Sequence, residues 1–361
     1  MTIMSPAAND DLGRPPANFS LDLVSGIAGL IAAAGYLIDA WSHAHFLISS
    51  ETYFTPTHGF LYGGFIAIGI FTTLSAARNH ARGYPWRCAL PRAYDLTVVG
   101  LAILIVGALP DYLWHLLYGI EESLDILFSP THILLGIGTA FVVLGPLRSA
   151  LEARPRPATL IAQLPALLSC AALVLLMMFF TQYVFNPGIE RAMTPVGMSR
   201  FGSDFEGTAF TYFRQSLAIL IIFAHAALIG GFSLFAIKQF SLRFGFLTLM
   251  LGISWAIVSA LLLNSSSAWL TNAGSAVIAG LAGDALVLWL RPGSVRIAEF
   301  RWFAFAVPAT FAAVLLILTA TIMGGTWFDR NIAIGTVLFS GAIGLFESYL
   351  SLPASATPDI G

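Results

Sequence analysis

Apolar residues along the chain form long runs that are separated by shorter polar stretches. Most of these runs reach about 20 residues, the length that a helix needs to cross a bilayer. The pattern predicts ten helices, at 20–46, 56–77, 94–118, 129–150, 158–186, 210–236, 244–264, 268–290, 299–323 and 331–351. The predicted fold is therefore all-α, a polytopic transmembrane helical bundle.

Basic residues are distributed unevenly over the loops between these helices. The loops that follow the second, fourth, sixth and eighth helices are basic and contain Arg78, Arg82, Arg87, Arg92, Arg148, Arg154, Arg156, Lys238, Arg243, Arg291, Arg296 and Arg301. The loops on the opposite side of the membrane, with the helix ends beside them, contain fewer basic residues, namely Arg191, Arg200, Arg214 and Arg330. Because cytoplasmic loops carry the excess of Lys and Arg, both termini are predicted to be cytoplasmic, in a plasma (inner) membrane.

A polar motif interrupts the apolar pattern twice. Its first copy contains Asp39 and His43 and ends in Phe-Thr-Pro-Thr-His58, and its second contains Asp111 and His115 and ends in Phe-Ser-Pro-Thr-His132. The sequence around each copy predicts a hairpin of two helices. Since each unit has an even number of spans, the two hairpins are predicted to be parallel tandem repeats, related by a pseudo-twofold axis along the membrane normal.

The chain is predicted to have three parts. Residues 1–18 are polar and proline-rich, which is typical of a disordered tail. Residues 19–153 contain the duplicated hairpin module. Residues 154–361 supply six further transmembrane helices, in which no clear copy of the motif is found.

The motif has the residue types and the spacing of a metal site. Asp and His four residues apart lie on one face of a helix, and the second His lies in the first turn of the next helix, just after a Pro that favours this position. One carboxylate and two imidazoles form a common ligand set for a divalent transition metal. The predicted ligands are Asp39, His43, His58, Asp111, His115 and His132.

These six ligands predict either one dinuclear site or two mononuclear sites. Further ligands, or partners that surround them, are predicted at His45, Glu51, Glu121 and Glu122. Two other readings of the motif stay open, a metal-free network of hydrogen bonds or proton carriers and a purely structural pairing of Asp with His. Two residues deeper in apolar sequence, Asp284 and His225, are candidates for an ion or proton path.

Composition supports the membrane assignment and excludes one class of partner. The 361 residues are 57% hydrophobic and 10% charged, whereas soluble domains carry about 25% charged residues. The lipid bilayer is therefore the predicted surrounding of the protein. A net charge of −2 argues against nucleic acid. The two cysteines, Cys88 and Cys170, have no spacing typical of a disulfide framework or a thiolate metal site.

The spacing of Asp39, His43 and His58, and again of Asp111, His115 and His132, resembles the copper-binding pattern in the C subunit of particulate methane and ammonia monooxygenases. The resemblance is confined to the motif within the first four predicted helices. The gaps to the second His are 14 and 16 residues, longer than in that family. The second copy also resembles segments of bacterial membrane proteins of unknown function. The resemblance implies copper as the metal, and redox or oxygenase-like chemistry.

The first hypothesis for function is an integral membrane metalloprotein with an outward-facing Asp/His site, for which copper is favoured and iron or zinc are alternatives. A second is a transporter of a metal ion or a proton-coupled solute. A third is a protein that binds b-type haem or quinone, and a fourth is a zinc hydrolase of membrane lipids. The sequence alone does not decide whether the protein is an enzyme.

Overall fold

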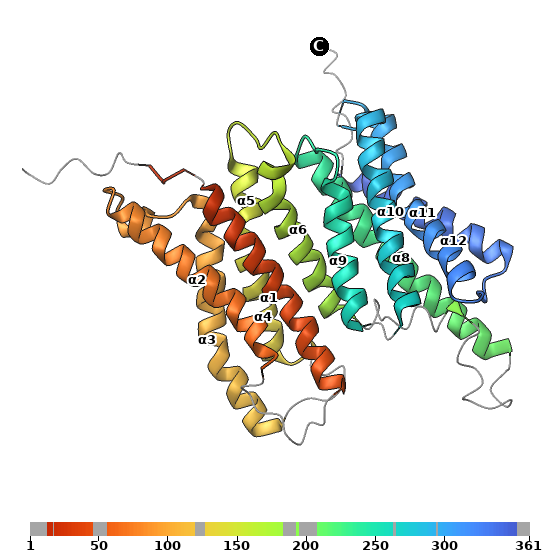
Figure 1. The fold of residues 1–361 in the computed structure, drawn as a ribbon, viewed down its shortest axis with the longest axis horizontal. Coiled ribbons are helices and arrows are strands. Elements are labelled where there is room, and N and C mark those ends of the chain that lie inside the picture. The colour runs from red at the N-terminus through yellow and green to blue at the C-terminus, as the bar shows by residue number, and fades with distance from the viewer. Residues whose placement is uncertain are drawn as a thin grey trace, which may run out of the picture. The chain divides into compact units, whose positions relative to one another are not determined.

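The computed structural model describes residues 13–16, 18–45, 56–119, 127–182, 193–194, 208–262, 265–293 and 295–351. The chain divides into two compact units, Met1–Phe180 and Thr181–Gly361. In these residues the regular structure is entirely helical, which confirms the predicted all-α class. Each unit is described by itself (Figure 1).

The first unit begins with two long helices and continues through a short basic connection. Its helices are α1 (Phe19–His45), α2 (His58–His80), α3 (Asp95–Tyr118), α4 (Pro130–Val143), α5 (Gly145–Glu152) and α6 (Leu160–Phe180), with the 3₁₀ turns η2 (Trp86–Cys88) and η3 (Arg92–Tyr94) before α3. Helix α1 packs on α2 and on α6, and α3 packs on α4. The first unit thus includes α6, one helix beyond the boundary predicted after residue 153, because α6 lies against α1.

The second unit consists of α8 (Thr208–Gln239), α9 (Phe246–Leu262), α10 (Ser266–Leu290), α11 (Ile297–Ile322) and α12 (Arg330–Ser351). Helices α9 to α12 pack in chain order, and α8 closes against α11 and α12. Among the described residues, nine helical segments are long and apolar enough to cross a membrane, with α4 and α5 counted as one. The remaining segment, Phe246–Leu261, is shorter.

The predicted helix at 129–150 is broken in two. Pro146 has no N–H to donate to Val142, so the α-helical hydrogen bond is lost there, and α4 ends at Val143. Hydroxyl groups from neighbouring helices pair with the carbonyls at the break: Thr97 Oγ1 donates to Val142 at 3.3 Å, and Ser169 donates to Val143. The break therefore ties α4 to both α3 and α6.

Glycines bring the helices of each pair close together. A Cβ atom on Gly64 would lie 2.6 Å from the Ala28 carbonyl of α1. A Cβ atom on Gly138, which like Gly64 stands six residues after a motif His, would lie 3.0 Å from Ile103 of α3. Small residues allow this close approach of helices in a bilayer, where packing rather than hydrophobic exclusion drives association.

At the other end of these helices a buried carboxylate joins three elements. Asp22 of α1 accepts hydrogen bonds from the Tyr94 hydroxyl of η3 and from Ser149 of α5, both at 2.7 Å. Charge-assisted hydrogen bonds of this kind are stronger than neutral ones, so Asp22 fixes how α1, η3 and α5 pack.

Candidate metal site

Helix α3 places Asp111 and His115 on one face, one turn apart. The helix ends at Tyr118, because Gly119 has a φ of +83°, a backbone region that glycine enters without strain. This ending turns the carbonyl of Gly119 back toward the helix. His115 Nδ1 lies 3.4 Å from that carbonyl oxygen. The contact favours a proton on Nδ1 and leaves Nε2 as the nitrogen directed toward Asp111.

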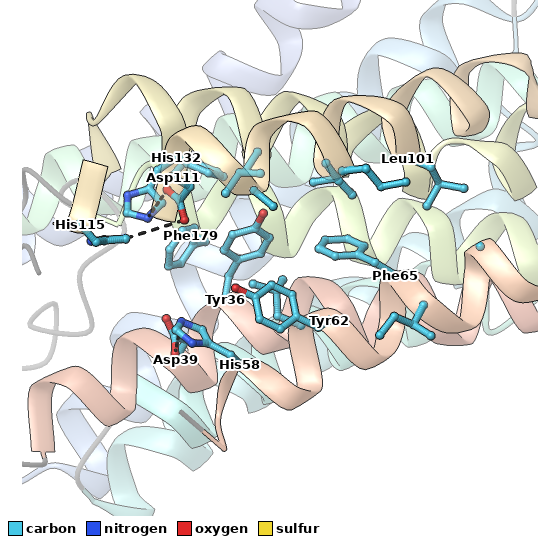
Figure 2. Close-up of a pocket in the computed structure, with 18 of the residues that line it drawn as sticks. Tyr36, Asp39, His58, Tyr62, Phe65, Leu101, Asp111, His115, His132 and Phe179 are labelled. Carbon is cyan, nitrogen blue, oxygen red and sulfur yellow. Dashed lines mark ion pairs between the residues drawn. The ribbon is translucent and has the colours of Figure 1, made fainter. Parts of the chain in front are cut away.

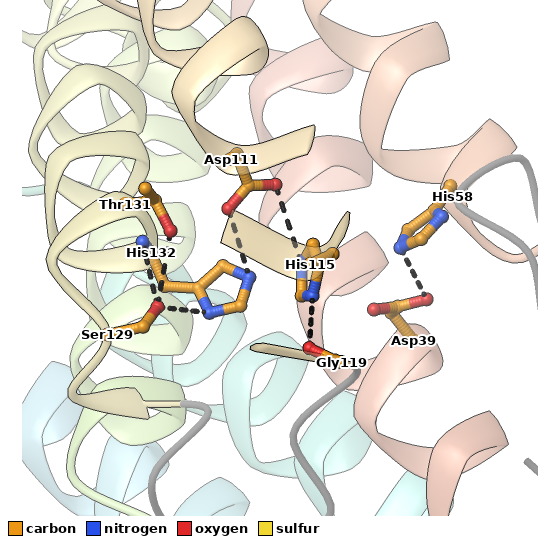
Figure 3. A network of polar contacts seen from close by, with 8 residues as sticks. All are labelled: Asp39, His58, Asp111, His115, Gly119, Ser129, Thr131 and His132. Carbon is orange, nitrogen blue, oxygen red and sulfur yellow. Dashed lines mark hydrogen bonds and ion pairs between the residues drawn. The ribbon is translucent and has the colours of Figure 1, made fainter. Parts of the chain in front are cut away.

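Helix α4 supplies His132 from its first turn (Figure 3). Ser129 is the N-cap, and its hydroxyl accepts a hydrogen bond from the His132 backbone N–H at 3.2 Å. The same Oγ lies 2.7 Å from His132 Nδ1. Pro130 begins the helix, where its missing N–H costs nothing. One residue therefore both starts the helix and holds the imidazole, so that Nε2 points away from Ser129.

Asp111, His115 and His132 form one cluster in which the carboxylate lies between the two rings (Figure 3). Asp111 Oδ2 lies 3.8 Å from Nε2 of His115, and Oδ1 lies 3.4 Å from Nε2 of His132. The ring centroids are 5.3 Å apart. One ligand atom from each residue lies within 4.8 Å of the others. Three of the six predicted ligands are therefore brought together.

The cluster fits a metal ion in two respects. Two atoms at about 2.1 Å from one tetrahedral ion lie about 3.4 Å apart, close to the observed separations of 3.4 and 3.8 Å. Asp111 is only 4% exposed, and its buried Oδ1 receives no hydrogen bond from the described residues. Nε2 of His132 is within ion-pair distance of that oxygen but lacks hydrogen-bond geometry. A cation between these atoms would satisfy both.

The first motif copy forms a different arrangement. His58 Nε2 lies 3.2 Å from Asp39 Oδ1, and the Thr57 hydroxyl donates to the same oxygen at 3.0 Å. The ring of His58 also lies beside that of Tyr62, with centroids 5.6 Å apart. The third predicted ligand, His43, belongs to α1 by its backbone, but its side chain lies outside the described part of the structure.

Both motif copies line one cavity of about 480 Å³ (Figure 2). Asp39 and His58 lie on one side of it and the Asp111 cluster on the other, with Tyr36 between them in the view. Asp39 and His58 are not part of the group of atoms within 4.8 Å. In the described residues the structure thus favours a mononuclear ligand set beside a separate Asp–His pair over one dinuclear site.

Several wall residues carry no sequence signal of their own. Tyr36 is buried in α1 and shares a hydrogen bond of 2.8 Å with Thr139 of α4. Phe179 and Phe180 reach the cavity from α6. A tyrosine or phenylalanine in an apolar helix is typical of any core, so only the packing of α6 on α1 identifies them. The partner Thr57 could have been noticed, since it directly precedes a motif His.

The other predicted polar residues lie elsewhere or outside the description. The side chain of His45 and all of Glu51, Glu121 and Glu122 lie outside the described residues. Asp284 accepts hydrogen bonds from the backbone N–H groups of Gly245, Leu247 and Thr248, at 3.0 to 3.1 Å, and from the Thr248 hydroxyl at 2.6 Å. This carboxylate caps the start of α9, which is a structural role.

His225 is buried in α8 of the second unit. Its ring lies beside Trp255 and Phe311, with centroids 5.6 and 5.5 Å away. Asp284 is thus enclosed by the start of α9, and His225 is enclosed by aromatic rings. Neither residue lines the cavity that holds the motif residues.

Comparison of the chain with protein-family models, with curated proteins and with solved structures finds no match. The resemblance to the monooxygenase C subunit therefore rests on motif spacing alone.

Proposed function

We propose that the protein is an integral membrane metalloprotein in which Asp111, His115 and His132 bind one divalent transition metal. The observation that carries the proposal is the convergence of ligand atoms from these three residues, together with a buried Asp111 oxygen to which no described residue donates a hydrogen bond. Two further features support it. Each imidazole has its Nδ1 beside an oxygen atom, and such partners orient metal-binding histidines in known sites.

Three protein ligands leave positions on the metal open for solvent or substrate. Two histidines and one carboxylate suit iron in oxygen-activating sites, and imidazole also suits copper and zinc. We propose copper first, because the motif resembles the copper-binding pattern of the monooxygenase C subunit. A redox or oxygenase-like activity follows from that choice and is part of the same proposal.

The predicted topology places the site on the non-cytoplasmic side of a plasma (inner) membrane. The loops that connect α1 to α2 and α3 to α4 contain no Lys or Arg, whereas the loops at the opposite ends are basic. The two hairpins, as parallel repeats, would direct both polar ends to the same side. Asp39 and His58 would then face the metal across the cavity, where they can hydrogen-bond a substrate or hold a proton.

Metal analysis of the purified full-length protein tests the proposal. We expect about one bound metal ion per chain, identified by elemental analysis together with absorption and paramagnetic-resonance spectra. The double substitution His115→Ala/His132→Ala should remove it. His80→Ala is the matched control, because His80 stacks on Trp86 at the other end of α2, away from the cavity.

Two results would contradict the proposal. One is a wild-type protein without stoichiometric metal under each of the copper, iron and zinc loading conditions. The other is metal content that the double substitution leaves unchanged. A strong haem absorption band from paired histidines would instead favour the haem hypothesis.

A further inference from the structure

The cavity beside the cluster of Asp111, His115 and His132 extends along the helices and reaches the outer surface of the unit. Its wall includes Ile66 of α2 and Ile105 of α3, which are 60% and 75% exposed. A second hollow shares Ile66, Gly69 and Thr73 with this cavity and continues over α2. The cavity therefore opens sideways between α2 and α3.

This opening lies on a face with the composition of a lipid-facing surface. In the most apolar 18-residue stretch of α2, only 22% is buried inside the protein, and in that of α3 only 28%. Both helices are long and apolar enough to cross a membrane. A molecule dissolved in the bilayer could thus enter the cavity without passing through water.

The lining is polar at one end and apolar along the rest. The motif residues gather at one end, while Phe65 and Leu101 lie farther along the cavity (Figure 2). From His115 to Leu101 the wall follows about four turns of α3, or about 20 Å at 1.5 Å per residue. This length suits an extended chain rather than a compact molecule.

The charges of the lining residues limit which kind of head group could lie at the polar end of the cavity. None of the described residues that line the cavity is Lys or Arg, whereas Asp39 and Asp111 are both there. With a divalent ion bound, Asp39 and Asp111 already balance its charge, so the described lining offers an anionic head no net positive charge in a partly buried site. A neutral hydroxyl or carbonyl oxygen can instead accept or donate hydrogen bonds, and can approach an open metal position.

We propose that the ligand of this site is a neutral, single-chain lipid, a long-chain alcohol or aldehyde. Its oxygen lies at the Asp111 cluster and its alkyl chain lies in the cavity between α2 and α3. The position of the head rests on the proposed metal site, whereas the position of the tail rests on the cavity alone. The volume of about 480 Å³ is within the range of small-molecule pockets.

A glycine in the wall allows a direct test. A Cβ atom on Gly69 would meet no atom within 4 Å, so a larger side chain fills cavity space without a clash. Gly63 lies on the same helix, is exposed, has equally open surroundings and does not line the cavity. Gly69→Leu and Gly63→Leu are therefore a matched pair that should both fold.

The experiment uses hexadecanol with a photoreactive diazirine at its tail end, added to the full-length protein in phosphatidylcholine nanodiscs. We expect saturable labelling of α2 and α3 peptides, competed by unlabelled hexadecanol. Labelling should fall about ten-fold in Gly69→Leu, the effect of losing about 1.4 kcal/mol of binding. Gly63→Leu should label like the wild type.

The outcomes separate this inference from the proposed function, because metal content is measured on the same samples. Labelling without bound metal would disprove the metal proposal and the position of the head, and would leave the tail site standing. Bound metal with diffuse or non-competed labelling, or with labelling unchanged in Gly69→Leu, would overturn the inference alone. Stronger competition by hexadecanoic acid or an isoprenoid quinol would overturn the neutral single-chain head.

Discussion

The two motif-bearing helix pairs, α1–α2 and α3–α4, use the same residue types at similar spacing and yet form different sites. In α3–α4, Asp111 meets two imidazoles and keeps a buried oxygen without a hydrogen bond. In α1–α2, Asp39 accepts a hydrogen bond from the Thr57 hydroxyl, and His58 lies beside the same oxygen. The Oδ1 atom of Asp39 thus already accepts a hydrogen bond, whereas no described residue donates one to Oδ1 of Asp111.

The start of the second helix in each pair explains this difference. Ser129 has extended backbone geometry (φ −60°, ψ 139°), so its side chain caps α4 and contacts His132. Thr57 has helical geometry (φ −68°, ψ −35°) and makes no capping hydrogen bond with its side chain. Its hydroxyl instead donates to Asp39 and lies 3.3 Å from the Ser42 hydroxyl. The two helices thus begin at different motif positions, and the hydroxyl directly before each motif His contacts a different group: Thr57 donates to Asp39, whereas Thr131 lies 3.3 Å from the Ser129 hydroxyl.

The strongest test of this comparison is substitution of the two carboxylates. Asp111→Asn should lower metal affinity by about 100-fold or more, since it replaces a ligand and removal of mere supporting partners already costs 10–100-fold. Asp39→Asn should leave metal content nearly unchanged. Elemental analysis and metal titration measure both. Loss of metal in both variants would show instead that the two pairs share one dinuclear centre.

A smaller effect is expected from the hydroxyl groups that precede each histidine. Ser129→Ala removes the partner of His132 Nδ1 and should weaken metal binding about ten-fold, whereas Thr57→Ala should not. Ser129→Ala also loses a helix cap, which costs about 1 kcal/mol. Ser265→Ala is the control, because the Ser265 hydroxyl caps α10 of the second unit by accepting a similar hydrogen bond from the Ala268 backbone N–H. Equal losses of metal in the Ser129 and Ser265 variants would assign the effect to stability alone.

The smallest effect concerns packing within the two pairs. A Cβ on Gly35 would lie 2.7 Å from the backbone nitrogen of Leu61, which cannot move easily. A Cβ on Gly107, which like Gly35 stands four residues before a motif Asp, would meet the flexible side chains of Leu135, at 3.1 Å, and Leu134, at 3.5 Å. Gly35→Ala should therefore destabilise the first unit by about 1 kcal/mol, and Gly107→Ala by less. Thermal unfolding in detergent compares them, and equal shifts would mean that both pairs adjust alike.

Sequence reasoning predicted much of the fold and part of the site. Long apolar runs predicted ten helices, and each corresponds to a described segment, because bilayer-spanning length and hydrophobicity are local properties of the chain. The break at Leu144 was missed, although Gly145-Pro146 follows it. The four-residue spacing of Asp111 and His115 correctly predicted a shared helix face. The pairing of Asp284 with α9 could not be predicted, since it depends on how separate helices meet.

What the sequence determined by itself is local: the helices, their apolar surfaces, and the presence of carboxylates and imidazoles near the helix ends. These follow from periodicity, helix geometry and the position of Pro at helix starts. What only the tertiary structure decided is the environment of those groups. It joined Asp111 to His115 and His132, gave Asp39 a hydroxyl partner, and placed both beside one cavity walled by α6. The physical reason is that side-chain orientation at a helix start and the approach of distant helices depend on packing between segments, which no single stretch of sequence contains.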